Sequence, residues 1–148
     1  MTSEPLIFFT DECLGRRVPK YLREAGLTVE LYLDWFDPAV PDVEWLPVVS
    51  EKGWVVLTKD GMIGRRIVEQ VALAQANARV FIMASKQPNT KEIAEGFAKA
   101  RSAMEQLAQE STAPFIAKVY KSGETSLWKD YVRLKELLKK YPKKEEKP

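Results

Sequence analysis

Two aspartates stand directly after strongly apolar segments, and their positions suggest shared chemistry. Asp11 closes the run of residues 6–10, and Asp60 follows the run of residues 54–58. A continuous apolar run is typical of a strand that is buried on both faces of a parallel sheet. Open parallel sheets bind ligands in the crevice beyond the carboxyl ends of their strands. If the two strands are neighbours, we expect Asp11 and Asp60 to meet at one sheet edge.

Two further acids, Asp42 and Glu44, lie at the start of a helix predicted over residues 43–52, with Asp42 as a plausible N-cap. A helix that runs antiparallel to the strand after it begins at the carboxyl edge of that strand. We therefore expect Glu44 to join Asp11 and Asp60. Three carboxylates repel one another unless a cation neutralises them. Such a site favours Mg²⁺ or Mn²⁺ and phosphoryl chemistry, in which the metal activates water.

A simpler interpretation of the same acids is structural. Carboxylates cap helix N-termini and are common in solvated loops, which could account for Asp42 and for Glu12 in particular. The pair Asp11 and Asp60 is harder to explain in this way, because each residue ends an apolar run.

The composition excludes several other chemistries. The chain has no histidine and one cysteine, Cys13. This excludes catalytic triads that need histidine, and it excludes a tetrahedral zinc site built from nitrogen and sulfur ligands. Any metal must be bound through oxygen, which again favours Mg²⁺ or Mn²⁺.

The bulk properties predict a soluble protein with a single domain. The chain has 148 residues, of which 45% are hydrophobic and 30% charged, and this length is sufficient for a substantial core. No apolar run reaches the roughly 20 residues that span a bilayer, and no signal-peptide pattern is present. We expect a cytoplasmic protein that does not contact membranes.

Strand and helix patterns alternate through the first 110 residues, which predicts a mostly parallel sheet with helices on both faces and right-handed crossovers. We expect one domain over residues 1–148, with a core at 6–110, a C-terminal hairpin and helix at 114–141 and a disordered basic tail at 142–148. The predicted strands are 6–10, 28–33, 54–58, 79–84, 115–120 and 125–128; the predicted helices are 14–25, 43–52, 63–76, 89–109 and 130–141.

A response-regulator receiver is an alternative for the same α/β pattern. Two acids after the first strand and Asp60 after the third fit a phospho-acceptor site. A receiver also needs a Ser or Thr and a Lys on successive strands. Here Ser85 and Lys86 are adjacent in the sequence, and no later strand is expected to supply the Lys, which weakens this interpretation.

Three segments together resemble the PIN-like nucleases, most closely the VapC45-like toxins and DUF5615-type PIN proteins. They are Phe9-Thr10-Asp11-Glu12, Pro41-Asp42-Val43-Glu44-Trp45-Leu46, and Gly53 to Asp60 followed by Arg65-Arg66. The resemblance spans about residues 6–84. It departs from the family pattern at Cys13, where an Asn is common, and at Gly61-Met62, where an Asp and a Phe often stand.

The resemblance implies a three-layer PIN-like α/β/α sandwich and a metal-dependent endoribonuclease, often the toxin of a type II toxin–antitoxin pair. It implies Asp11, Glu44 and Asp60 as catalytic metal ligands, Thr58 as an accessory hydroxyl and Asp42 as an accessory acid. A fourth acid is not identified, so a catalytically degenerate PIN-like binding module is the alternative.

Basic and aromatic side chains near the acidic edge could hold RNA. Arginine side chains match phosphate geometry, and aromatic rings stack on unpaired bases. Trp35, Phe36 and Trp45 are the aromatic candidates, although core packing or a protein interface is the better explanation for any one of them. The C-terminal helix is expected to pack on its own domain, and the alternative is that it serves a homodimer or an antitoxin. The basic candidates for RNA binding are Arg16, Arg17, Lys59, Arg65 and Arg66.

Overall fold

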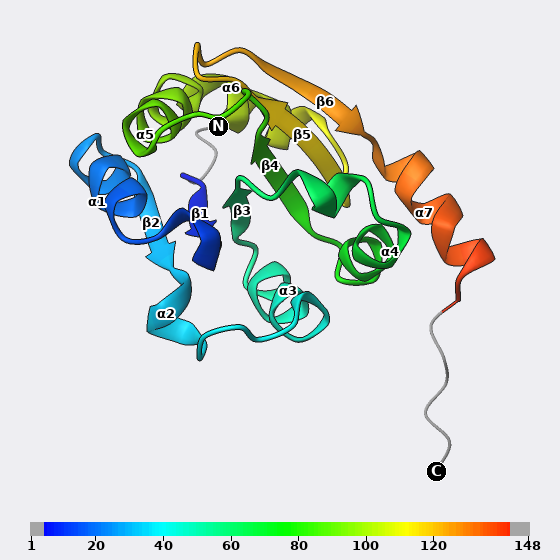
Figure 1. Ribbon diagram of the computed structural model, residues 1–148. Helices are drawn as coiled ribbons and strands as arrows, with labels where there is room; N and C mark the ends of the chain where they lie inside the picture. The colour runs from blue at the N-terminus through cyan, green and yellow to red at the C-terminus, as the bar shows by residue number, and fades with distance from the viewer. Residues whose placement is uncertain (1–4, 143–148) are drawn as a thin grey trace.

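The computed structural model describes residues 5–142, which form one six-stranded sheet with helices on both faces (Figure 1). The strand order is β2-β1-β3-β4-β5-β6. The first five strands of this order are parallel, and β6 pairs antiparallel with β5. The mostly parallel sheet predicted from the sequence is therefore confirmed. The strands are β1 (Ile7–Thr10), β2 (Thr28–Leu31), β3 (Val55–Thr58), β4 (Arg79–Met83), β5 (Phe115–Val119) and β6 (Thr125–Lys129).

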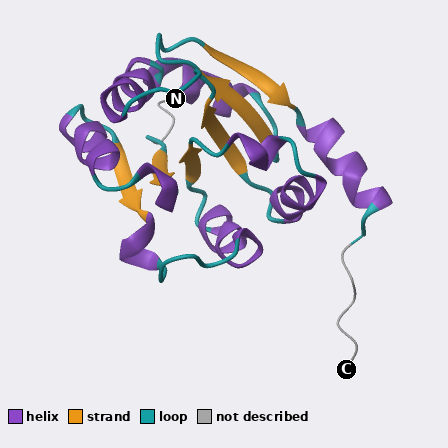
Figure 2. Cartoon of the chain, in the orientation of Figure 1, coloured by secondary structure: helices purple, strands orange, loops and turns teal. Residues whose placement is uncertain are grey.

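Helices form the two outer layers of a three-layer sandwich (Figure 2). Helices α1, α5 and α6 cover one face of the sheet, and α3, α4 and α7 cover the other. Their bounds are α1 (Arg17–Glu24), α2 (Tyr32–Trp35), α3 (Asp42–Glu51), α4 (Ile67–Gln75), α5 (Thr90–Lys99), α6 (Arg101–Glu110) and α7 (Tyr131–Lys140), with the 3₁₀ helices η1 (Glu12–Leu14) and η2 (Gly61–Gly64).

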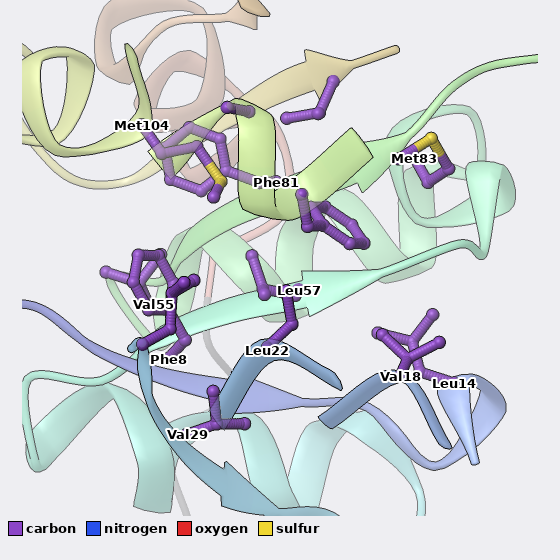
Figure 3. Packing of buried hydrophobic residues seen from close by; sticks show 14 of the residues in the cluster. Phe8, Leu14, Val18, Leu22, Val29, Val55, Leu57, Phe81, Met83 and Met104 are labelled. Atoms are coloured by element: carbon purple, nitrogen blue, oxygen red, sulfur yellow. The ribbon is translucent and has the colours of Figure 1, made fainter. Parts of the chain in front are cut away.

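Each face of the sheet has its own hydrophobic core because side chains alternate along each strand. Phe8, Val55 and Leu57 point into the core beneath α1, α5 and α6 (Figure 3). Phe9 and Val56 point the other way, into the core beneath α3, α4 and α7. The central strands are buried on both faces, which explains their continuous apolar sequences.

Aromatic packing around Phe9 fixes the position of α3 beside β1. The Phe9 ring lies 5.5 Å from the ring of Trp45 and 5.9 Å from that of Phe36, centroid to centroid. Trp45 is almost completely buried. Trp35 is half exposed but packs edge-on against Trp54 at 4.9 Å. Trp45 and Phe36 therefore pack in the hydrophobic core, and part of the Trp35 ring is in contact with Trp54.

Several predicted element boundaries are wrong. The second strand ends at Leu31 rather than residue 33, because Tyr32 begins α2 and its buried hydroxyl accepts a hydrogen bond from the Val40 N–H at 2.9 Å. The helix predicted over 89–109 is divided at Ala100, although helical hydrogen bonds continue on both sides of this residue.

The starts of two helices also differ from prediction. Pro41, and not Asp42, is the N-cap residue of α3, and Asp42 occupies its first turn. Residues 61–64 form a separate 3₁₀ turn, so α4 begins at Ile67, which is exposed, and not at residue 63. The tail predicted to be disordered lies, from residue 143 onward, outside the described residues.

The antiparallel pair β5–β6 contains a bulge. Ile116 pairs with Lys129 and Ala117 pairs with Leu127, so Trp128 is the extra residue on β6. A bulge of this kind bends the strand and can redirect a side chain. Among the described residues, no helix is long and apolar enough to cross a membrane.

Candidate active site at the carboxyl edge of the sheet

The strand order places the ends of β1 and β3 on either side of a topological switch point. From β1 the chain proceeds outward to β2 under α1, whereas from β3 it proceeds to β4 in the opposite direction under α4. Helices leave the two strands on opposite faces, so the connections diverge and open a crevice between them. Asp11 follows β1, and Thr58 and Asp60 stand at the end of β3.

Thr58 joins the two strand ends. Its buried hydroxyl donates a hydrogen bond to Asp11 Oδ2 at 2.9 Å and accepts one from the Asp60 N–H at 3.1 Å. The Asp11 N–H donates to the Leu57 carbonyl at 3.0 Å. The Asp60 side chain caps η2 by accepting from the Met62 N–H at 3.0 Å. The sequence therefore positions both aspartates through a single threonine.

The electrostatics of Asp11 reflect this arrangement. Burial raises the pKa of its carboxyl, and the negative charge of Asp60 raises it further. Hydrogen bonds from Thr58, the Glu12 backbone and Cys13 act in the opposite direction. A partly buried carboxylate beside a second acid is an environment that a bound cation stabilises.

Cys13 lies beside the carboxylate of Asp11. Its sulfur lies 3.6 Å from Asp11 Oδ2 and 3.3 Å from Thr58 Oγ1. Burial of the sulfur and the charge of Asp11 raise the pKa of the thiol, so Cys13 stays protonated and can donate. A thiol thus contacts the carboxylate where a side-chain amide would donate more strongly.

Asp42 extends the acidic group from the opposite side of the crevice. Its Oδ1 accepts a hydrogen bond from the indole N–H of buried Trp45 at 3.0 Å, which fixes the carboxylate on the side of α3 that faces the core. Burial raises the pKa of Asp42, and the charges of Asp11, Asp60 and Glu69 add to this effect. Its charge is therefore coupled to both strand-end aspartates.

Glu44 lies in the same turn of α3 but is exposed. Two residues along an α-helix do not share a face. Because Asp42 is fixed toward the core by Trp45, Glu44 projects toward a different side of the helix. The geometry thus brings Asp42 toward Asp11 and Asp60 more directly than Glu44.

Two other glutamates complete the surroundings. Glu12 Oε1 accepts from the Ala39 N–H at 3.0 Å and so secures the loop that leads into α3. Glu69 on α4 pairs with Arg66 at 3.5 Å, and its second oxygen is buried without a hydrogen-bond partner. Glu69 was not identified from the sequence, because nothing in the helical pattern of α4 distinguishes it from a surface residue.

These residues fit a hard divalent cation. The donors are carboxylate oxygens with a threonine hydroxyl beside them, and Glu69 contributes a buried oxygen that lacks a partner. Within residues 5–142, however, no three acidic or cysteine side chains converge closely enough to enclose an ion by themselves. Mg²⁺ usually keeps several waters and uses only one or two carboxylates, which is consistent with this open arrangement.

The predicted basic residues divide into separate groups around the acids. Arg16 and Asp11 line a small cavity beyond β1, and Arg17 is exposed at the start of α1. Arg66 is engaged by Glu69. Lys59 and Arg65 line a larger cavity of about 330 Å³ beyond β3, β4 and β5.

Sequence reasoning missed the far side of that larger cavity. Lys118 and Tyr120 from β5 and its end, together with Trp128 from β6, also line it. Ser85, at the end of β4, is another lining residue. A lysine on the strand after Ser85 is therefore present, and the sequence-based argument against a receiver was wrong on this point.

Comparisons with known proteins assign the fold to a family. Residues 6–85 match the model of the PIN like domain, and the chain belongs to this family. It is also 29% identical over 119 residues to the protein named "Putative ribonuclease VapC45" from Mycobacterium tuberculosis, an alignment that covers 77% of this chain and 86% of that protein. No solved structure matches. The expected resemblance to PIN-like proteins is confirmed, and the receiver alternative is set aside.

Proposed function

We propose that this protein is a divalent-cation-dependent endoribonuclease that hydrolyses RNA phosphodiester bonds, with Asp11, Asp42 and Asp60 at its active site. The observation that carries the proposal is the joining of Asp11 and Asp60 by the Thr58 hydroxyl at the switch point. It lies inside the segment that matches the PIN like domain. The relative named as a ribonuclease supports the choice of RNA as substrate.

Asp42 replaces Glu44 as the third carboxylate in this proposal. The charge of Asp42 acts on the same site as Asp11 and Asp60, whereas Glu44 is exposed on another side of α3. Glu44 remains within the same helical turn, so a direct comparison of the two residues is possible.

A bound Mg²⁺ or Mn²⁺ would neutralise phosphate charge and make water more acidic. The chain supplies what would surround it: Asp11, Asp42 and Asp60 would hold the cation, and the Thr58 hydroxyl orients Asp11 and opposes the rise of its pKa. With no histidine in the chain, a carboxylate of this group accepts the proton of the attacking water. Arg16 and Lys59 lie beside the acids and can bind phosphate oxygens.

Cleavage of single-stranded RNA in the presence of Mg²⁺ or Mn²⁺ tests the proposal, with a chelator as control. Asp11→Asn and Asp60→Asn should each lower the cleavage rate by on the order of a hundredfold, because each removes a proposed ligand of the cation that would stabilise charge on the reacting phosphate. Equal rates in wild type and both variants would overturn the site. Absence of cleavage, together with absence of cation binding in calorimetry, would favour a degenerate binding module.

We also propose that the protein acts as the toxin of a type II toxin–antitoxin pair, as the VapC45 name of its relative suggests. Expression should then arrest growth, and co-expression of a small neighbouring gene should relieve the arrest. The partners in this proposal are RNA and an antitoxin protein, with a homodimer as a further possibility that sedimentation would test. Growth arrest that Asp60→Asn does not abolish would contradict it.

A further inference from the structure

The cavity of about 330 Å³ beside Asp60 has a chemical character that the acidic site does not explain. Its floor is formed by the ends of β3, β4 and β5, and its walls are η2 on one side and the β5–β6 hairpin on the other. Lys59, Arg65 and Lys118 place three cationic side chains around it. Lys59 and Gly61, the two neighbours of Asp60 in the sequence, both line the cavity, so it is continuous with the acidic edge.

The cations of this cavity are not neutralised by the protein. Within residues 5–142, none of these three cations has a side-chain nitrogen within 4.0 Å of a carboxylate oxygen. Lys118 instead places its Nζ 4.1 Å from the centroid of the Trp128 ring. Lys129 lies 5.2 Å from the same ring, and the pKa of Lys129 is lowered by burial and by the charges of Arg133 and Lys118. Positive charge is therefore concentrated here without a counterion from the chain.

Trp128 is held in place by a specific contact. It is the extra residue of the β6 bulge, and its ring packs on Gly64 so closely that a Cβ at this glycine would lie 2.1 Å from the ring. The bulge thus turns Trp128 toward η2, the segment that follows Asp60. This contact fixes the hairpin, and Lys118 with it, at a constant position relative to the acidic edge.

We propose that this cavity is a subsite for a backbone phosphate of single-stranded RNA, adjacent to the phosphate that the acids act on. Lys59, Arg65 and Lys118 bind the phosphate oxygens, and the half-buried Tyr120, which also lines the cavity, borders the adjoining nucleoside. An acidic protein segment would also be attracted to these cations, but the continuity with Asp60 favours the substrate strand. The proposal deepens the proposed function and rests on it for the identity of the ligand.

Binding in the absence of divalent cations tests the subsite separately from catalysis. The probe is a short fluorescein-labelled single-stranded RNA in chelator, and the readout is anisotropy over a range of KCl concentrations. Lys118→Gln should weaken binding roughly two- to fivefold and should lower the slope of log affinity against log salt by about 0.7, the value for one phosphate contact on a single strand. Lys118→Arg should retain most of the affinity because it keeps the charge.

The chain offers a matched control in Lys52, which also lies over tryptophan rings, at 4.9 Å from Trp35 and 5.5 Å from Trp54, but precedes β3 at the opposite edge of the sheet. Lys52→Gln should leave both affinity and salt slope unchanged. Equal losses in Lys52→Gln and Lys118→Gln, or wild-type binding by Lys118→Gln with an unaltered melting temperature, would overturn the subsite. Loss of an antitoxin's binding by Lys118→Gln while RNA binding is kept would assign the cavity to the protein partner and also overturn it. If only the proposed catalytic function of the acids were wrong, the protein would bind RNA normally but would not cleave it.

Discussion

The hydroxyl of Thr58 donates to the carboxylate of Asp11 at 2.9 Å, and this bond ties the carboxyl ends of two adjacent parallel strands. The same hydroxyl accepts from the backbone of Asp60. Thr58 therefore sets the position of one proposed ligand and the backbone of another.

Thr58→Val tests this function of the hydroxyl with little change in volume. Asp60 N–H and Asp11 Oδ2 would each lose a buried partner, so we expect a loss of roughly 1–3 kcal/mol in the free energy of unfolding. The hydrogen bond from Thr58 lowers the pKa of Asp11. Its removal should raise that pKa further and shift the pH dependence of Mn²⁺ binding toward higher pH, as measured by calorimetry. Thr58→Ser keeps the hydroxyl and should retain the wild-type pH dependence; an identical shift in both variants would contradict the assignment.

Asp11→Asn should stabilise the metal-free protein at neutral pH. The folded-state pKa of Asp11 is raised above its ordinary value of 3.8. The folded state thus favours the protonated carboxyl, and the wild type loses this stability as pH rises through the raised pKa. The variant has no charge to bury, so its advantage should be present at pH 7 and absent below pH 3.8. Chemical unfolding at the two pH values measures the difference.

Addition of Mn²⁺ should make the wild type more stable than Asp11→Asn, which reverses their order of stability without metal. A cation that binds only the folded state stabilises the wild type in proportion to its concentration, whereas Asp11→Asn lacks a ligand. A variant that remains more stable than wild type at saturating Mn²⁺ would show that Asp11 does not bind the ion.

Asp42→Asn and Glu44→Gln distinguish the two candidates for the third carboxylate. Both substitutions are nearly isosteric and remove one charge from the first turn of α3. We expect Asp42→Asn to lower the rate of RNA cleavage by on the order of a hundredfold and Glu44→Gln to leave it almost unchanged. The opposite result would restore Glu44 as the ligand, and circular dichroism would verify that both variants keep their helices.

Gly64→Ala tests the contact between η2 and the hairpin. The new Cβ would lie 2.1 Å from Trp128, so the ring or η2 must move, at a cost of roughly 1–3 kcal/mol in unfolding free energy. Gly61→Ala is the matched control in the same turn, since a Cβ there meets nothing within 4 Å. Thermal unfolding of both variants gives the comparison. A destabilisation of similar size at Gly61 would attribute the effect to backbone conformation instead of the Trp128 contact.

The sequence was sufficient to predict the sheet and the strand-end acids. Buried parallel strands have continuous apolar sequences, so β1 and β3 and the positions of Asp11 and Asp60 could be read directly. The choice between Asp42 and Glu44 could not be read from the sequence. It depends on the rotation of α3 about its axis, which the buried indole of Trp45 determines. Tertiary packing decides such rotations, and local propensity carries no information about them.

The far wall of the cavity beside Asp60 was also beyond prediction. Lys118 and Trp128 are far from Asp60 in the sequence, but they line the same cavity as its neighbours Lys59 and Gly61. The bulge at Trp128 is a register irregularity between two strands. Strict alternation of side chains along β6 would have predicted the wrong face of the sheet for Trp128.

That bulge also affects how the molecule can associate. β6 is an edge strand, and an unpaired edge can template pairing with another chain. The bulge bends β6, and Lys129 adds a charge near its end; both features discourage edge-to-edge growth. At the other edge, β2 has only four residues before α2 begins. Neither edge is suited to extending the sheet between copies, so aggregation through cross-strand pairing is disfavoured, and a homodimer would form through helices or loops.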